Sequence, residues 1–141
     1  MIHRIRDSDL VLEATKRYKE EIVGLNVPEW VNNPANVALR NEQGDVSLFE
    51  RNWRQPSTVS GHYFFISRGG DARKAAEEML EEIFTGDYGV TIVTGLTPVT
   101  HRGALMMNKF LGFKTVDTIN TEIGDCELVM LTKEQWEGMN K

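Results

Sequence analysis

Apolar residues in the middle of the chain recur at intervals of three and four positions, which is the spacing of one face of an α-helix. The pattern follows Asp71 and consists of Ala72, Ala75, Ala76, Met79, Leu80, Ile83 and Phe84. Because an α-helix has 3.6 residues per turn, these side chains fall on one side. The pattern predicts a long helix that begins at the break formed by residues 68–71 and is closed by Gly86 and Gly89.

Shorter runs of β-branched and aromatic residues predict strands. The predicted strands cover residues 1–5, 37–40, 46–51, 58–67, 90–94, 113–122 and 126–132. Asn41-Glu42-Gln43-Gly44 is a turn signal, so the second and third strands form a hairpin. The apolar run that ends the strand over residues 58–67 indicates a central strand covered on both faces. Gly95 and Pro98 end the next strand, and Gly124-Asp125 forms the last turn.

Other segments are predicted to be wholly or partly helical. Side-chain oxygens in Asp7-Ser8-Asp9 cap the start of a first helix, which runs to about Ile22. Residues 26–36 are irregular or form a short second helix. Residues 100–111 form a helix stopped by Gly112, and residues 133–139 form a loose helical turn. Strands with interposed helices predict one α/β domain, residues 1–141, whose mixed sheet is covered on both faces.

The composition is that of a soluble globular domain. The chain has 141 residues, of which 40% are hydrophobic and 26% are charged, and it is long enough to bury a core. No run approaches the roughly 18 apolar residues of a membrane span, and the N-terminus lacks the apolar segment required for export. Cys126 is the single cysteine, which excludes an intrachain disulfide and a cysteine-based zinc site. We therefore expect a protein of the reducing cytoplasm.

The charge pattern narrows the choice of partners. The formal net charge is -5, which argues against broad attraction to nucleic acid. Arg68, Arg73 and Lys74 cluster just ahead of several glutamates, a block that is typical of a solvated helix face. The histidines at positions 3, 62 and 101 lie on separate predicted elements without the spacing of metal ligands. No metal site is therefore predicted.

The stretch from His101 to Phe113, followed by two strands, resembles a motif of the GNAT superfamily of N-acetyltransferases. Members commonly have a helix that reads Asn-x-x-Ala-x-x-x-Tyr-x-x-x-Gly-Phe between a strand and a hairpin. Ala104 and the ending Leu111-Gly112-Phe113 match, and the order of elements agrees over nearly the whole chain. The resemblance implies a mixed, mostly antiparallel central sheet with a V-shaped splay and helices on both faces.

Two positions depart from that motif. His101 replaces the family's asparagine, and Asn108 replaces the tyrosine that often protonates the departing thiolate of coenzyme A. An asparagine does not act as an acid at neutral pH, and Tyr63 on the central strand is a candidate substitute. In an active enzyme, Glu50, His62 or an ordered water would deprotonate the incoming amine. The same two residues also fit a solvated carboxylate at a strand end and a half-buried histidine bonded to a backbone group.

A second family signature is a pyrophosphate-binding loop that reads Gln/Arg-x-x-Gly-x-Gly/Ala. Free amides and the helix dipole attract anions to such a helix N-terminus. The aligned residues are Arg68, Gly69, Gly70, Asp71, Ala72 and Arg73. Arg68 and Ala72 fit, whereas Asp71 replaces a glycine and Arg73 a small residue. Two interpretations stay open: a working phosphate loop in which Arg68, Arg73 and Lys74 offset the Asp71 charge, and a tight turn into a helix capped by the Asp71 carboxylate.

The first hypothesis that follows is an enzyme. The resemblance implies that acetyl-coenzyme A lies in the V between the strands that end at Ser67 and Thr94. Its pyrophosphate would rest on Gly69 to Arg73. Its pantetheine would pair with the backbone of Phe65, Ile66 and Ser67.

The second hypothesis is an assembly factor without catalysis. The opening Met-Ile-x-Arg-Ile-Arg, the Arg-Gly-Gly turn and the stretch from Gly95 to Pro98 resemble small GNAT-like proteins of tailed bacteriophages. Some of these are head-assembly or internal virion proteins. That resemblance implies a role in the cytoplasm of the host cell, with capsid or other virion proteins as partners. A second copy of the chain, as in a homodimer, is a further candidate partner.

Overall fold

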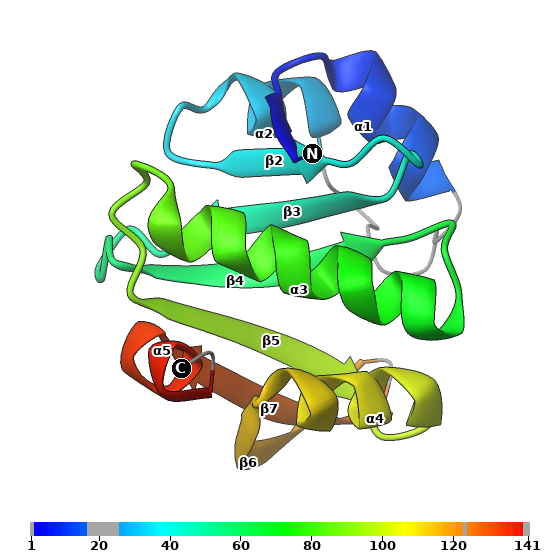
Figure 1. Cartoon of the computed structure of the whole chain (residues 1–141), viewed down its shortest axis with the longest axis vertical. Helices are drawn as coiled ribbons and strands as arrows, with labels where there is room; N and C mark the ends of the chain where they lie inside the picture. The colour runs from blue at the N-terminus through cyan, green and yellow to red at the C-terminus, as the bar shows by residue number, and fades with distance from the viewer. Residues whose placement is uncertain (1, 17–25, 123, 140–141) are drawn as a thin grey trace.

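One sheet organises the part of the chain that the structure describes (Figure 1). The computed structural model describes residues 2–16, 26–122 and 124–139. Within them, seven strands lie in the order β1-β2-β3-β4-β5-β7-β6. Their bounds are His3–Ile5 (β1), Val37–Arg40 (β2), Val46–Arg51 (β3), Thr58–Phe64 (β4), Ile92–Pro98 (β5), Lys114–Thr121 (β6) and Gly124–Thr132 (β7). All neighbouring pairs are antiparallel except β4 and β5, which are parallel.

Helices cover both faces of the sheet, as predicted. Their bounds are Ser8–Thr15 (α1), Val27–Asn32 (α2), Gly69–Thr85 (α3), Arg102–Leu111 (α4) and Lys133–Met139 (α5). Side chains alternate across a strand, so neighbouring residues of β2 serve different cores. Val37 and Leu39 pack in the cluster under α3, whereas Ala38 packs in the cluster with α1 and α2. We call these two sides the α3 face and the α1–α2 face.

The helix α3 has the apolar face that its periodicity predicts. Its buried residues are Ala72, Ala75, Ala76, Met79, Leu80, Ile83 and Phe84. Its C-cap is Gly86, so the predicted helix stop is confirmed. An added Cβ at this position would lie 2.3 Å from the ring of Tyr88. The stop at Gly112 is confirmed as well, since this glycine caps α4 with φ at 92°, a conformation that favours glycine.

The parallel strands β4 and β5 pair over only part of their length. Thr58, Val59 and Ser60 lie opposite Ile92, Val93 and Thr94. Beyond Ser60 and Thr94 both strands continue, but they no longer pair with one another. This separation is the splay that the sequence resemblance implies. It opens the sheet near its centre.

The predicted first helix is described only as far as Thr15, and its continuation to Ile22 lies outside the described residues. Its start is confirmed, because Asp7 is the N-cap and accepts a hydrogen bond from the Asp9 amide. The structure also settles the segment over residues 26–36, which contains the short helix α2. No helix among the described residues is long and apolar enough to cross a membrane.

Four predictions about strands were wrong. The central strand ends at Phe64 rather than Ser67, because the amides of Ile66 and Ser67 bond to the Asp45 side chain instead of a neighbouring strand. It is not covered on both faces either, since His62 is exposed.

The strand β5 does not end at Gly95. It continues to Pro98 because β7 pairs with it along its whole length, while its other edge no longer pairs with β4. A proline is tolerated on such a free edge. Likewise Gly124 begins β7 instead of forming the turn.

Candidate functional site

A cavity of about 290 Å³ lies where β4 and β5 separate. From β4 and the residues after it come Gly61, His62, Tyr63 and Phe65; β5 contributes the run from Val93 to Pro98, and α4 contributes Gly103, Ala104, Met107 and Asn108. Since no strand pairing closes the sheet beyond Ser60 and Thr94, the gap gives the cavity access to both faces.

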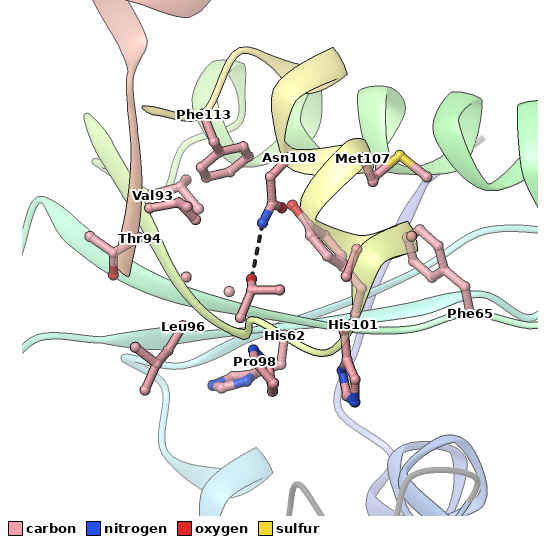
Figure 2. Close-up of a pocket in the computed structure, with 18 residues that line it drawn as sticks. His62, Phe65, Val93, Thr94, Leu96, Pro98, His101, Met107, Asn108 and Phe113 are labelled. Atoms are coloured by element: carbon pink, nitrogen blue, oxygen red, sulfur yellow. Dashed lines mark hydrogen bonds between the residues drawn. The ribbon is translucent and has the colours of Figure 1, made fainter. Parts of the chain in front are cut away.

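The side chains around the cavity divide between the two faces of the sheet (Figure 2). Met107 and Asn108 lie on one side of the strands, and His62, Leu96 and Pro98 lie on the other. Cluster membership agrees with this view, because Tyr63 and Phe65 pack under α3 whereas Phe64 packs with α1 and α2. The cavity therefore has one side toward α3 and α4 and another toward the α1–α2 face. Two molecules entering from opposite faces would meet between the strands.

Asn108, the residue at the family's tyrosine position, lies in the cavity wall. It is buried, and its side-chain amide donates a 3.0 Å hydrogen bond to Thr97 Oγ1 on β5 (Figure 2). Its backbone carbonyl accepts a hydrogen bond from the Phe113 amide at 2.9 Å, just after α4 ends. The bond to Thr97 joins α4 to the free part of β5. Asn108 thus stabilises the cavity wall and supplies no acidic proton.

The start of α3 is open to solvent. The N-cap residue is Arg68, whose side chain makes no capping hydrogen bond. Residues 68–71 are exposed, and an added Cβ at Gly69 or Gly70 would meet nothing within 4 Å. Gly69 has φ at +56°, a left-handed conformation that glycine adopts without strain. Its backbone is accessible to an anion.

Asp71 does not cap α3, so the interpretation of a carboxylate-capped helix was wrong. It lies within the first turn, after the Arg68 N-cap. The side chain lines a separate polar pocket that it shares with Ser67, Lys74 and Glu78. An N-cap residue precedes the helix, and its side chain accepts from the amides of the first turn that follows, whereas Asp71 is itself the third residue of α3.

Arg73 connects the two helices beside the cavity. Its guanidinium bonds to Glu77 at 3.0 Å and lies over the Phe110 ring, 4.6 Å from the ring centroid. Glu77 is one turn along α3, whereas Phe110 belongs to α4. The guanidinium therefore lies on the exposed surface between α3 and α4. Ala72, the neighbouring candidate, is buried in the α3 core and offers no polar side chain.

The segment Phe65-Ile66-Ser67 is held by a buried carboxylate. Asp45 accepts hydrogen bonds from the Ile66 amide at 2.7 Å, the Ser67 amide at 2.8 Å and the Ser67 hydroxyl at 2.6 Å. Two of the three amides in the backbone segment predicted to pair with pantetheine are therefore already engaged. Burial on its own raises the pKa of Asp45, but hydrogen bonds from Ser67, Asn41 and Ile66 outweigh it and lower the pKa below its usual value.

Glu50 and His62 come together on the α1–α2 face. Glu50 lies opposite Ser60 in the sheet, and His62 lies two residues further along the same strand, so the two side chains are diagonal neighbours. The Trp30 indole donates to Glu50 Oε1 at 3.1 Å and orients the carboxylate. Both residues are exposed, so the prediction that His62 is half-buried was wrong.

Two residues that shape the site were missed in the sequence. Asp45 follows a turn and carries no periodic signal, and Thr97 lies in a stretch predicted to end the strand. A Gly-Asp pair directly after a hairpin turn is ordinary turn chemistry. Only the fold shows that this carboxylate reaches residues 66 and 67. Among the described residues, no three acidic, histidine or cysteine side chains gather as metal ligands.

The sheet order, the separated parallel strands and the helices on both faces define the GNAT N-acetyltransferase fold. No family model and no curated protein matches the sequence. Among solved structures, the chain is similar to the spermidine/spermine N-acetyltransferase SpeG from Vibrio cholerae, with a TM-score of 0.77 and 12% identity over 100% of this chain and 98% of that one. It is also similar to the aminoglycoside acetyltransferase AAC(6')-Ib in complex with coenzyme A, with a TM-score of 0.72 and 14% identity over 100% and 99%.

Proposed function

We propose that this protein is an acetyl-coenzyme A-dependent N-acetyltransferase. One observation carries the proposal: a cavity lies where β4 and β5 separate, and outside it the fold places the open N-terminus of α3 after β4 and the oriented Glu50 carboxylate on the α1–α2 face. A transferase needs such access for two reactants, because the acyl donor and the acceptor must meet at one carbon. The structural relatives support the proposal, since SpeG and AAC(6')-Ib are named as acetyltransferases.

The donor would bind on the side of α3 and α4. Its pyrophosphate would be held by the amides of Gly69 and Gly70 and by the charges of Arg68 and Arg73. An uncapped helix N-terminus attracts anions through its free amides and its dipole. Asp71 opposes this attraction, and Lys74, which lines the same separate polar pocket, would offset its charge. The residues present therefore fit a pyrophosphate group.

The thioester arm would extend from this loop into the cavity. Because Asp45 already binds the amides of Ile66 and Ser67, the carbonyl groups of this segment are the groups that would pair with the pantetheine. Apolar side chains of Phe65, Val93 and Met107 line the path. They would exclude water from the thioester, which protects it from hydrolysis.

The acceptor amine would approach from the α1–α2 face. Glu50, His62 or a water bound between them would remove a proton from the amine, and the nitrogen would attack the thioester carbonyl. SpeG is a spermidine/spermine acetyltransferase by name, and AAC(6')-Ib is an aminoglycoside acetyltransferase with a structure in complex with kanamycin. We therefore infer an amine of a small molecule or protein as the acceptor here.

The head-assembly role stays a prediction from the sequence. The structural relatives are enzymes, and no observation in the described part of the chain identifies a virion partner. The same holds for a homodimer.

Release of free thiol tests the enzymatic proposal. Purified protein is incubated with acetyl-coenzyme A and, one at a time, spermidine, kanamycin and a lysine-containing peptide. Amine-dependent thiol release above the rate without protein is expected for at least one acceptor. If the protein binds acetyl-coenzyme A but accelerates transfer to none of them, a binding role replaces the catalytic one.

A further inference from the structure

The sheet face that carries Glu50 has an exposed apolar part. On β1 to β4 the apolar side chains of this face pack with α1 and α2 in one buried cluster. On β5 and β7 the apolar side chains of the face are Leu96, Leu128 and Met130, and none of the three belongs to either cluster of described residues. Leu96 is 43% exposed, and the other two are half-buried. We call these three residues the apolar strip.

Strand pairing places the apolar strip on the same face as the candidate base. Residues directly opposite one another in a sheet share a face. One row of directly opposed residues crosses four strands and consists of Glu50, Ser60, Thr94 and Met130. Leu96 lies two residues beyond Thr94 and is opposite Leu128. Adjacent strands lie about 4.8 Å apart, so roughly 10 Å separate β3 from β5, and a small molecule bound between them reaches both.

The apolar strip is continuous with the cavity. Leu96 and Pro98 line the cavity on the side of the strands where His62 also lies (Figure 2). Leu96 is therefore part of both the cavity wall and the strip. A molecule whose nitrogen lies in the gap between β4 and β5 would rest the remainder of its body on Leu96 and Leu128.

The charges around the apolar strip do not favour a second cationic group. The residues of β5 and β7 that share this face are uncharged, and they are Thr94, Leu96, Pro98, Cys126, Leu128 and Met130. Beyond them on β6, Lys114 lies opposite Met130 and Asp117 lies opposite Leu128, so the two edge charges offset one another. An ammonium group on an apolar surface loses hydration without gaining a partner. The strip therefore fits an uncharged apolar group.

We propose that the acceptor is a small primary amine that carries a single positive charge on an alkyl or aromatic body. The inference rests on the proposed function and names the substrate class of that site. The nitrogen lies in the gap beside His62, and the body lies on the apolar strip. As the C–N bond forms, the C–S bond of the thioester breaks. The nitrogen loses its proton to Glu50, His62 or water, and the electron pair left on sulfur takes up a proton as coenzyme A leaves as a thiol.

Heptylamine and 1,6-diaminohexane test the substrate class. They have equal numbers of non-hydrogen atoms and differ at the far end, which is a methyl group in the first and an ammonium group in the second. With saturating acetyl-coenzyme A, kcat/KM for heptylamine should exceed that for the diamine at least about tenfold. Calorimetric binding of both amines to protein loaded with coenzyme A should follow the same order. Equal values, or a preference for the diamine, would overturn the inference and leave the proposed transferase in place.

A carboxylate placed on the apolar strip should shift this preference. In Leu96→Glu the new carboxylate would attract the far ammonium group, so the ratio of the two kcat/KM values should fall at least about fivefold. Leu96→Ala adds no charge and should raise KM for heptylamine more than for the diamine. The control Val99→Glu changes a residue that is 40% exposed and is not among those that line the cavity. It should keep the wild-type ratio, and a wild-type ratio in both Leu96 variants would contradict the proposed contact.

A second copy of the chain is the competing occupant of the apolar strip. Light scattering of wild type and Leu96→Glu at the assay concentration separates the two. A wild-type dimer that dissociates in Leu96→Glu would assign the strip to the partner copy and overturn the inference, whereas the same mass for both proteins supports it. If acetyl-coenzyme A binds but no amine is acetylated, spermidine included, the proposed function fails and the substrate class fails with it.

Discussion

Asp45 and Ser67 are joined by two hydrogen bonds to one side chain, from the Ser67 amide at 2.8 Å and from its hydroxyl at 2.6 Å. The first residue ends the turn between β2 and β3, and the second lies in the loop that leads to α3. The pair connects a hairpin turn to the open helix N-terminus. The carboxylate itself is fully buried. Its hydrogen bonds fix the loop on which the proposed donor would rest.

Removing this carboxylate should destabilise the protein. Asp45→Ala leaves the amides of Ile66 and Ser67 without an acceptor, so we expect a loss of about 3 kcal/mol in the free energy of unfolding. Affinity for acetyl-coenzyme A should fall as the loop loosens. Urea unfolding measures the first effect and calorimetry the second. The control Asp87→Ala, at an exposed turn, should change stability by less than about 0.5 kcal/mol.

The stabilisation from Asp45 should depend on pH. Because the folded-state pKa of Asp45 is lowered, its contribution is present above the unfolded value of about 3.9 and is lost as the pH falls below it. The stability difference between wild type and Asp45→Asn should therefore shrink between about pH 4 and pH 2. Unfolding curves across this range measure it. A difference that stays constant to pH 2 would contradict a charged Asp45.

Charge at the start of α3 should control donor binding. Arg68→Glu places a carboxylate at the open N-terminus of α3, so affinity for acetyl-coenzyme A should fall at least about tenfold. The loss should be smaller at high salt, because screening weakens exposed charges. Lys114→Glu makes the same charge change on exposed β6 and is expected to bind normally. Equal affinities for the two variants would place the phosphates elsewhere.

Glu50 should matter for transfer and little for folding. Glu50→Gln keeps an oxygen for the Trp30 indole but removes the base, so transfer should fall about a hundredfold if the carboxylate deprotonates the amine. Stability should change by less than about 0.5 kcal/mol. Thiol release and thermal melting are the two measurements. Glu29→Gln, exposed on α2, should leave both unchanged, and a normal rate for Glu50→Gln would assign the base to His62 or water.

Most of the fold could be predicted from local patterns in the sequence. The long helix could be predicted because its apolar residues repeat with one period from Ala72 to Phe84, and local chemistry stopped it at Gly86. The hairpin over residues 37–51 could be predicted for the same reason, since its turn and both strands lie within one short stretch. Interactions of this kind need no knowledge of distant residues.

The features that could not be predicted from the sequence depend on contacts between residues far apart in the chain. The central strand stops at Phe64 because the amides of Ile66 and Ser67 donate hydrogen bonds to Asp45, which lies far earlier in the chain. Pro98 stays in a strand because β7 pairs with β5 there. The structure brings Glu50 and His62 to the same face of the sheet, whereas Asp71 lines a separate polar pocket and His62 is exposed. Neither has a counterpart in local propensity.

Calorimetric titration of wild-type protein with acetyl-coenzyme A tests the central claim most directly. We expect saturable binding of one ligand per chain, reduced in Arg68→Glu and retained in Lys114→Glu. A protein that releases no heat on titration to millimolar ligand, and that does not melt at a higher temperature in its presence, would contradict a donor site between β4 and β5.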